Sequence, residues 1–244
     1  MLNEDHSVMN YQLIKVCGMR DAQNIREVAA LGVNLIGLIF YPKSPRYVES
    51  ISSDAGIIPD YSSLTPKPLS KGEGSDMLDK QLKAVGVFVN DMPQNIVTAV
   101  YNYHLSYVQL HGDESPVMID NLRRTLVPDI VPQIKIIKGI SVSSAEDLKR
   151  CEQYEGHVDL FLFDTKCKGY GGSGQKYDWS VLEAYTGQTP FLLSGGIGPD
   201  DADRLRDFHH PQCVGIDLNS KFETAPGMKD INLLQNFLHQ LNKQ

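Results

Sequence analysis

The sequence predicts an α/β fold, a single (β/α)8 TIM barrel with an irregular region where its second helix should lie. Eight short apolar runs, several of them nearly continuous in Val, Ile, Leu and Phe, are typical of strands buried on both faces. Stretches with helical spacing separate most of these runs, as in a parallel sheet with crossover helices. The chain has 244 residues. Eight units therefore take about 30 residues each, the usual size of a β/α unit.

The expected strands follow one another along the chain at regular distances. They are residues 13–17, 34–40, 84–89, 107–110, 133–138, 158–163, 190–194 and 213–218. An open, doubly wound sheet is the alternative, but that fold usually has fewer strands and a phosphate loop after the first one. The tetrapeptide Cys17-Gly18-Met19-Arg20 follows the first strand here, and it is not such a loop.

Five stretches between the strands place apolar residues on one helical stripe. They are residues 22–31, 94–103, 143–154, 200–208 and 230–241. Ser144 and Asp147 have the spacing of a capping box, and Pro199 suits a first helical turn. Residues 50–82 fit no regular helix, because they combine prolines, serines and a GEG tract. We expect a short or irregular second helix there and a flexible surface loop at 60–82.

The composition is that of a globular, acidic protein. Hydrophobic residues make up 41% of the chain, charged residues make up 22%, and the formal net charge is −7. This charge argues against a broad surface for nucleic acid. No apolar run is long enough to span a membrane, and the polar N-terminal extension (1–11) lacks the pattern of a secretory signal. We therefore expect one barrel domain in the cytoplasm, with neither nucleic acid nor membrane as a partner.

In this fold the active site lies at the C-terminal ends of the strands and in the loops that follow them. Cys17 shares one strand face with Lys15, which would favour the thiolate and lower the pKa of the thiol. Asp164 lies above two leucines on one face, and a carboxylic acid above such an apolar layer can donate a proton. His111 could be a ligand or a general base. Each has a plainer interpretation, as an inert thiol, a turn carboxylate and a structural histidine.

Three further features suggest ligand binding. Gly195-Gly196 and Asn219-Ser220 follow the seventh and eighth strands, where backbone N–H groups and a helix N-terminus can hold a phosphate. The tract 169–174 has the spacing of a dinucleotide-binding loop but does not directly follow a strand, so we interpret it as a mobile loop that could close over a ligand, with plain glycine turns as the alternative. Arg46, between proline and tyrosine, suits a bidentate contact to a carboxylate or else is a solvated surface charge. The cysteines show no metal-binding spacing.

Taken together, these residues make the chain resemble the phosphoribosylanthranilate isomerase family, whose members are the third enzyme of tryptophan biosynthesis. The motifs that carry the resemblance extend over most of the chain, and as an ordered set they are highly specific. They are KVCG (15–18), GLIFYPKSPRY (37–47), VGVFVN (85–90), VQLHGDE (108–114), LFDT (162–165), GGSG (171–174) with DW (178–179), LSGGI (193–197) and GID (215–217).

The resemblance implies an Amadori rearrangement of N-(5-phosphoribosyl)anthranilate to 1-(2-carboxyphenylamino)-1-deoxyribulose 5-phosphate. It implies that Asp164 is the general acid that protonates the furanose ring oxygen and that Cys17 is the general base that removes the C2 proton. Arg46 would bind the anthranilate carboxylate. The other residues expected to contact the substrate are His111, Gly195, Gly196, Asp217, Asn219 and Ser220. Neither a cofactor nor a metal is expected, and the protein should be a monomer or a weak homodimer.

The chain departs from the family pattern after the eighth strand. The family usually has Ser-Ser-Gly-Val-Glu there, whereas Asp217 is followed here by LNSKFE, with Lys221 in place of the glycine. This change keeps open a barrel that binds a phosphosugar without turning it over. The related histidine-pathway isomerase uses two aspartates, and indole-glycerol-phosphate synthase uses a lysine and a glutamate, so Cys17 with Asp164 disfavours both. A thiol redox protein is disfavoured because no resolving cysteine adjoins Cys17.

Overall fold

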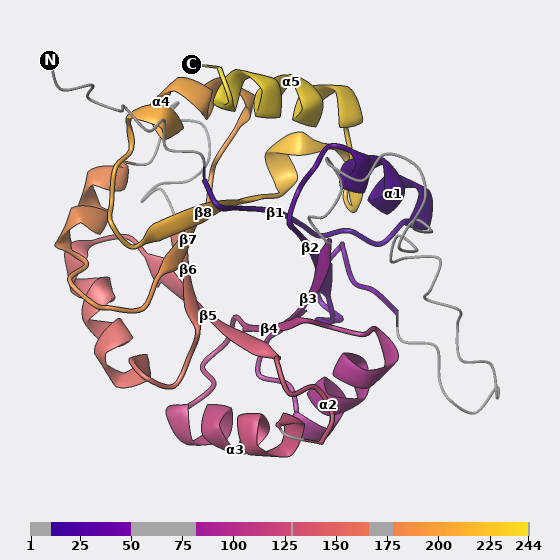
Figure 1. Ribbon diagram of the computed structural model, residues 1–244, viewed down its shortest axis with the longest axis vertical. Coiled ribbons are helices and arrows are strands. Elements are labelled where there is room, and N and C mark those ends of the chain that lie inside the picture. Colours follow the sequence, from indigo (N-terminus) through magenta and orange to yellow (C-terminus); the bar gives the residue numbers. More distant parts are fainter. Residues whose placement is uncertain (1–10, 50–81, 128, 166–177, 244) are drawn as a thin grey trace, which may run out of the picture.

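Eight parallel strands close into a barrel in their order along the chain. The computed structural model describes residues 11–49, 82–127, 129–165 and 178–243. The strands are β1 (Leu13–Cys17), β2 (Leu35–Ile39), β3 (Lys83–Phe88), β4 (Tyr107–Leu110), β5 (Lys135–Val142), β6 (Leu160–Thr165), β7 (Phe191–Ser194) and β8 (Cys213–Leu218). Figure 1 looks down this barrel, with β1 beside β8. The predicted (β/α)8 barrel is confirmed.

Helices surround the barrel (Figure 1). The α-helices are α1 (Ala22–Ala30), α2 (Pro93–Asn102), α3 (Pro116–Leu126), α4 (Ala202–Asp207) and α5 (Ile231–Leu241). The 3-10 helices are η3 (Ala145–Tyr154), η4 (Trp179–Ala184), η5 (Pro199–Asp201) and η6 (Ser220–Phe222). A small antiparallel sheet of β9 (Glu223–Ala225) and β10 (Met228–Lys229) follows η6. Within the described parts of the chain, no helix is long and apolar enough to cross a membrane.

The helices differ from the sequence prediction in several places. The stretch 143–154 forms the 3-10 helix η3 instead of an α-helix. The predicted capping box is present: Asp147 accepts hydrogen bonds from the backbone N–H groups of Ser143 and Ser144. The stretch 200–208 divides into η5 and α4. Helices α3 and η4 were not predicted. The expected extension at 1–11, the loop at 60–82 and the glycine tract at 169–174 lie outside the described residues, except for Tyr11 and Leu82.

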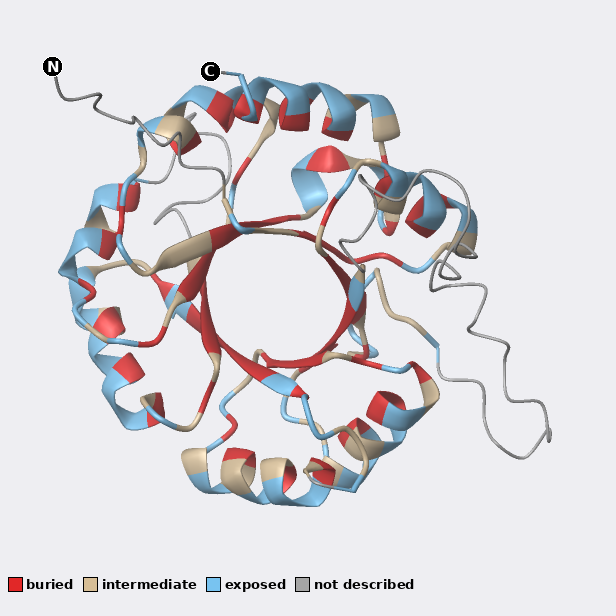
Figure 2. Cartoon of the chain, viewed as in Figure 1, coloured by how far each residue is buried: buried red, intermediate tan, exposed pale blue. Residues whose placement is uncertain are grey.

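Two apolar cores lie on the two sides of the barrel wall, and Figure 2 shows the buried strands and the buried inner faces of the helices. The outer core packs between the strands and the helices. The inner core fills the barrel with side chains from six strands, namely Leu35, Val85, Tyr107, Ile137, Leu160, Leu162 and Leu192. Alternation along β6 then places Asp164 on the face of Leu160 and Leu162, as predicted. Polar side chains at the strand ends therefore stand on an apolar plug.

Candidate active site

A cavity of about 470 Å³ lies at the C-terminal ends of the strands. Its lining brings together eight of the nine predicted site residues, namely Cys17, His111, Asp164, Gly195, Gly196, Asp217, Asn219 and Ser220. Arg46 does not line the cavity, but it contacts residues that do. A smaller hollow of about 330 Å³ lies between η3 and η4 and includes none of the predicted residues. The chemistry is therefore concentrated at the barrel mouth.

Cys17 ends β1 and is almost fully buried. It pairs with Gly37 of β2, where a Cβ atom would stand only 2.6 Å from the cysteine Sγ. Glycine at this position therefore leaves the space that the thiol occupies. Burial raises the pKa of the Cys17 thiol above its ordinary value, although the neighbouring ammonium of Lys15 opposes this. Lys15 thus acts on this pKa in the predicted direction, but the net shift is upward, because desolvation outweighs the attraction between the two charges.

The side chain of Lys15 is completely buried inside the barrel. Its Nζ atom lies 3.0 Å from Oδ1 of Asp217, its register partner on β8. The Ser194 hydroxyl donates to the other carboxylate oxygen at 3.2 Å. Burial alone would lower the pKa of Lys15, but Asp217 outweighs it and the pKa is raised. The barrel thus holds a permanent ammonium group close to Cys17.

Asp164 stands near the end of β6 with its side chain 21% exposed. The loop after β7 packs closely against it, because a Cβ atom at Gly195 would lie 2.2 Å from the Thr165 carbonyl oxygen and 2.9 Å from Asp164 Oδ1. Gly195 also has a φ of +92°, a conformation that favours glycine. A glycine in this loop is therefore needed to bring the backbone against the carboxyl group.

His111 faces Asp164, with Nε2 at 3.7 Å from Oδ2. Its Nδ1 atom lies 3.1 Å from the amide nitrogen of the buried Gln109. When that amide donates, the neutral imidazole carries its proton on Nε2, the nitrogen that faces Asp164. The Gln109 Oε1 atom has no partner among the described residues, and a buried acceptor of this kind calls for a donor from a ligand or from water. Sequence reasoning missed Gln109, although it shares a strand face with His111.

Arg46 is not a solvated surface charge. Its Nε donates to both carboxylate oxygens of Glu223, at 2.8 and 3.0 Å, and its Nη2 donates to one of them at 2.6 Å. Burial would raise the pKa of Glu223, but the hydrogen bonds from Arg46 and Lys229 hold it at about 2. Glu223 is therefore ionised. Sequence reasoning singled out neither Glu223 nor Lys229, because the motif around Arg46 carries no sign of partners so far along the chain.

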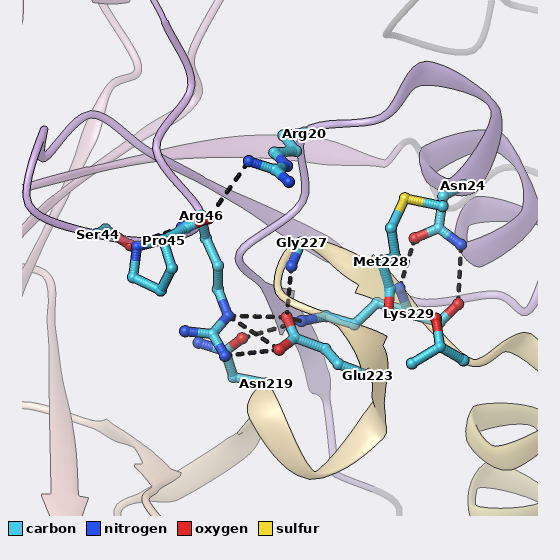
Figure 3. Close-up of polar contacts among 11 residues, drawn as sticks. Arg20, Asn24, Ser44, Pro45, Arg46, Asn219, Glu223, Gly227, Met228 and Lys229 are labelled. Carbon is cyan, nitrogen blue, oxygen red and sulfur yellow. Dashed lines mark hydrogen bonds and ion pairs between the residues drawn. The ribbon is translucent and has the colours of Figure 1, made fainter.

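Lys229 joins this ion pair to the loop after β8 (Figure 3). Its Nζ atom donates to Glu223 at 2.6 Å and to Oδ1 of Asn219 at 2.9 Å. Burial lowers the pKa of Lys229, against the effect of Glu223. The backbone of Lys229 exchanges two hydrogen bonds with the side chain of Asn24 on α1, at 2.8 and 2.9 Å. The small β9–β10 sheet is therefore attached both to α1, near the start of the chain, and to the loop after β8, near its end.

The expected phosphate loops lie on one side of the cavity. Gly196 has a φ of +69°, and a Cβ atom placed there would meet nothing within 4 Å. Asn219 and Ser220 bring the start of η6 to the same lining. Lys221, where the resemblance leads us to expect a glycine, is exposed and also lines the cavity. Its side chain therefore adds a cation to this lining.

A buried ion pair shapes the loops after β3 and β4. Lys138 of β5 is fully buried and donates to the Gly112 carbonyl at 2.6 Å and to Glu114 at 3.2 Å. The Glu114 carboxylate also accepts from the backbone N–H groups of Asn90 and Gly112. These contacts fix the turn that directly follows His111.

Comparison with known sequences identifies a family and close relatives. The pattern of the N-(5'-phosphoribosyl)anthranilate (PRA) isomerase family matches residues 69–240. The chain is 46% identical to the N-(5'-phosphoribosyl)anthranilate isomerase of Parabacteroides distasonis over 94% of its own length and 93% of the relative's. The enzyme of the same name from Phocaeicola vulgatus is 40% identical over 95% of this chain and 98% of the relative.

Solved structures give the same similarity in three dimensions. Phosphoribosyl anthranilate isomerase from Thermotoga maritima has a TM-score of 0.70 and 28% identity, covering 94% of this chain and 98% of that one. A phosphoribosyl anthranilate isomerase in complex with reduced 1-(o-carboxyphenylamino)-1-deoxyribulose 5-phosphate has a TM-score of 0.69 and 25% identity, covering 94% and 97%. The similarity therefore extends over the whole barrel.

Proposed function

The chain belongs to the N-(5'-phosphoribosyl)anthranilate isomerase family, and on this premise we propose how the groups at its barrel mouth share the work of the reaction. The enzyme isomerises N-(5'-phosphoribosyl)anthranilate in the biosynthesis of tryptophan. Cys17 acts as the general base and Asp164 as the general acid. The observation that carries this assignment is that the Cys17 thiol and the Asp164 carboxyl group line the same cavity from different strands.

The reaction needs a proton donor first and a proton acceptor second. Asp164 gives its proton to the furanose ring oxygen, and the C1–O bond breaks while the anilino nitrogen lone pair forms a protonated Schiff base. Cys17 as thiolate then removes the C2 proton, and those electrons form the C1–C2 double bond of an enol. Transfer of a proton from the enol oxygen to C1 gives the ketone. The buried Lys15 ammonium favours the thiolate that this step requires.

The two anionic ends of the substrate bind on two groups of residues. We assign the anthranilate carboxylate to Arg46 because a guanidinium binds a carboxylate with two parallel hydrogen bonds. The phosphate lies on the backbone of Gly195, Gly196 and the start of η6, with Lys221 as an additional cation. His111 and Asp217 line the space between and contact the ribose. A related isomerase binds a ligand that carries both a carboxyphenyl group and a phosphate, which supports a site with room for both ends.

A cytoplasmic location and a monomeric or weakly dimeric state remain expectations of the sequence. A cytoplasmic location suits an enzyme of amino-acid biosynthesis. The dimer would be weak because the large apolar side chains exposed in the described residues, Met92, Tyr101 and Val117, are scattered over α2 and α3.

The decisive experiment is a fluorescence assay in which phosphoribosylanthranilate is generated in situ and its loss is followed. The Cys17→Ser variant should lose turnover by at least about a hundredfold, because a serine alkoxide is not available at neutral pH. The Asp164→Asn variant should behave in the same way, because an amide cannot donate the required proton. Both variants should still bind the reduced product analogue, with affinity measured by calorimetry.

The outcomes separate catalysis from binding. Near-normal turnover in either variant would remove that residue from the acid–base mechanism. Tight binding of the analogue without turnover in the unmodified protein would instead describe a phosphosugar-binding barrel. An exposed glutamate with a surface partner, Glu146→Gln, serves as the control and should keep full activity.

A further inference from the structure

The guanidinium group of Arg46 is held by a protein carboxylate before any substrate arrives. Glu223 takes up the Nε–Nη2 edge of the group through three short contacts. A guanidinium is planar and presents its donors along fixed edges. In the described parts of the chain, the Nη1 donors have no hydrogen-bond partner, so the Nη1–Nη2 edge remains for a second carboxylate. One arginine can therefore connect a protein carboxylate with a ligand carboxylate in the same plane.

The position of Arg46 is constrained along the whole side chain. Its Cδ atom would lie 2.5 Å from a Cβ atom at Gly18, directly after Cys17, so the arginine stem runs close against this backbone. Its backbone N–H donates to the Ser44 hydroxyl at 3.1 Å, and Ser44 lines the cavity. The side chain is 18% exposed, whereas that of Glu223 is 5% exposed. Glu223 is thus the buried partner that decides the direction of the guanidinium.

The charges in this cluster leave one positive charge in excess. Arg46 and Lys229 are two cations around the single carboxylate of Glu223, and the side chain of Lys229 is completely buried. Burying such a cluster is costly unless its charges are balanced. A carboxylate on the ligand would complete the balance, whereas a neutral group at the same place would not. Figure 3 shows Lys229 between Glu223 and Asn219, so the cluster also reaches the loop after β8.

We propose that Glu223 is a positioning residue that aims Arg46 at the substrate carboxylate, and that Lys229 holds Glu223 in register with the phosphate loop. This inference rests on the proposed function, which assigns the carboxylate to Arg46. Glu223 itself does not touch the substrate. It instead sets the selectivity of the enzyme for aminoaldoses whose aromatic ring carries an ortho carboxylate.

The test compares two ligands that differ only in that carboxylate. One is the reduced product analogue, and the other is the matched analogue made from aniline instead of anthranilate. Calorimetry gives the ratio of their dissociation constants, which we expect to be about tenfold to a hundredfold in the unmodified enzyme. Arg46→Ala should bring the ratio close to one. Glu223→Gln should lower the ratio at least about fivefold while kcat at saturating substrate changes by less than about threefold.

The controls keep the result interpretable. Glu223→Asp retains the charge and shortens the reach, so it should fold and give an intermediate ratio. If Glu223→Gln fails to fold, Glu223→Asp decides the question. Glu146→Gln, which removes a carboxylate from the surface pair with Lys149, should leave the ratio unchanged.

Two results would overturn the inference. Glu223 variants that weaken both ligands equally would show a general structural role, and variants that leave the ratio unchanged would show no role in carboxylate recognition. If Arg46→Ala also leaves the ratio unchanged, the carboxylate binds elsewhere and the assignment in the proposed function fails. A ratio that depends on Arg46 but not on Glu223 would refute the positioning role alone.

Discussion

Cys17, the proposed general base, lies in surroundings that oppose its ionisation. Its burial raises the pKa of the thiol, and the nearby Lys15 ammonium recovers only part of the cost of forming a thiolate there. The proposed mechanism therefore uses a thiolate that burial disfavours.

This arrangement predicts how the reactivity of Cys17 depends on pH. Because burial raises the pKa of the thiol, the thiolate is a small fraction at neutral pH, and that fraction grows about tenfold with each unit of pH increase until the pKa is reached. We therefore expect the rate of Cys17 alkylation by iodoacetamide to rise from neutral pH upward. Peptide mass spectrometry separates Cys17 from Cys151 and Cys213, whose pKa values burial raises to about 12.

The dependence of the alkylation rate on pH tests directly whether burial raises the pKa of the Cys17 thiol. A rate for Cys17 that levels off below the ordinary thiol pKa of about 8.5 would contradict the effect of burial. Protection of Cys17 by the product analogue would confirm that the reacting thiol is the one in the cavity.

At the scale of elements, the closeness of β1 and β2 decides where the thiol lies. Gly37→Ala would place a methyl group 2.6 Å from Cys17 Sγ, whereas Gly86→Ala on β3 would press against Leu105 and Phe88 in the outer core. Overpacking should lower the unfolding free energy of each variant protein by about 1–3 kcal/mol. Only Gly37→Ala should also lower kcat, by about tenfold or more, because only it displaces the base.

Urea unfolding and steady-state kinetics on the two glycine variants separate these effects. Equal losses of kcat in both would mean that activity follows stability and not the position of the thiol. Full activity in Gly37→Ala would mean that β1 can shift without consequence for catalysis.

The same scale shows what sequence patterns capture. Apolar runs located all eight strands because a strand buried on both faces needs an unbroken apolar segment. Alternation along β6 placed Asp164 on the face of Leu160 and Leu162, because successive side chains of a strand point to opposite faces. Helix α3 was missed although Ser115 and Pro116 form a helix start, because Arg123 and Arg124 make its later turns strongly polar. Glu223 was missed as the partner of Arg46 because the two lie 177 positions apart, and no local pattern reports such a contact.

For the molecule as a whole, an ion pair inside the barrel joins the first and last strands. Lys15 and Asp217 lie 202 positions apart and meet inside the barrel at 3.0 Å. Lys15→Met should lower the unfolding free energy by about 3–5 kcal/mol, because it leaves a buried carboxylate without its cation. The double variant Lys15→Met/Asp217→Leu should recover a large part of this loss.

Urea unfolding of the two single variants and the double variant measures this coupling. The exposed Lys149→Met variant is the matched control, and it should change stability by no more than about 1 kcal/mol. A double variant as unstable as the sum of the single variants would show that the two groups stabilise the barrel independently.

The attachment of β10 to α1 has a consequence for the timing of synthesis. A chain leaving the ribosome presents Cys17 and Arg46 early, but Glu223 and Lys229 appear only in its last tenth. Domains generally gain structure from the N-terminus as they are made. Glu223 cannot hold the guanidinium group of Arg46 in place until that final segment has folded back onto Asn24. On the proposed roles of these residues, catalytic maturity is therefore a property of the finished chain.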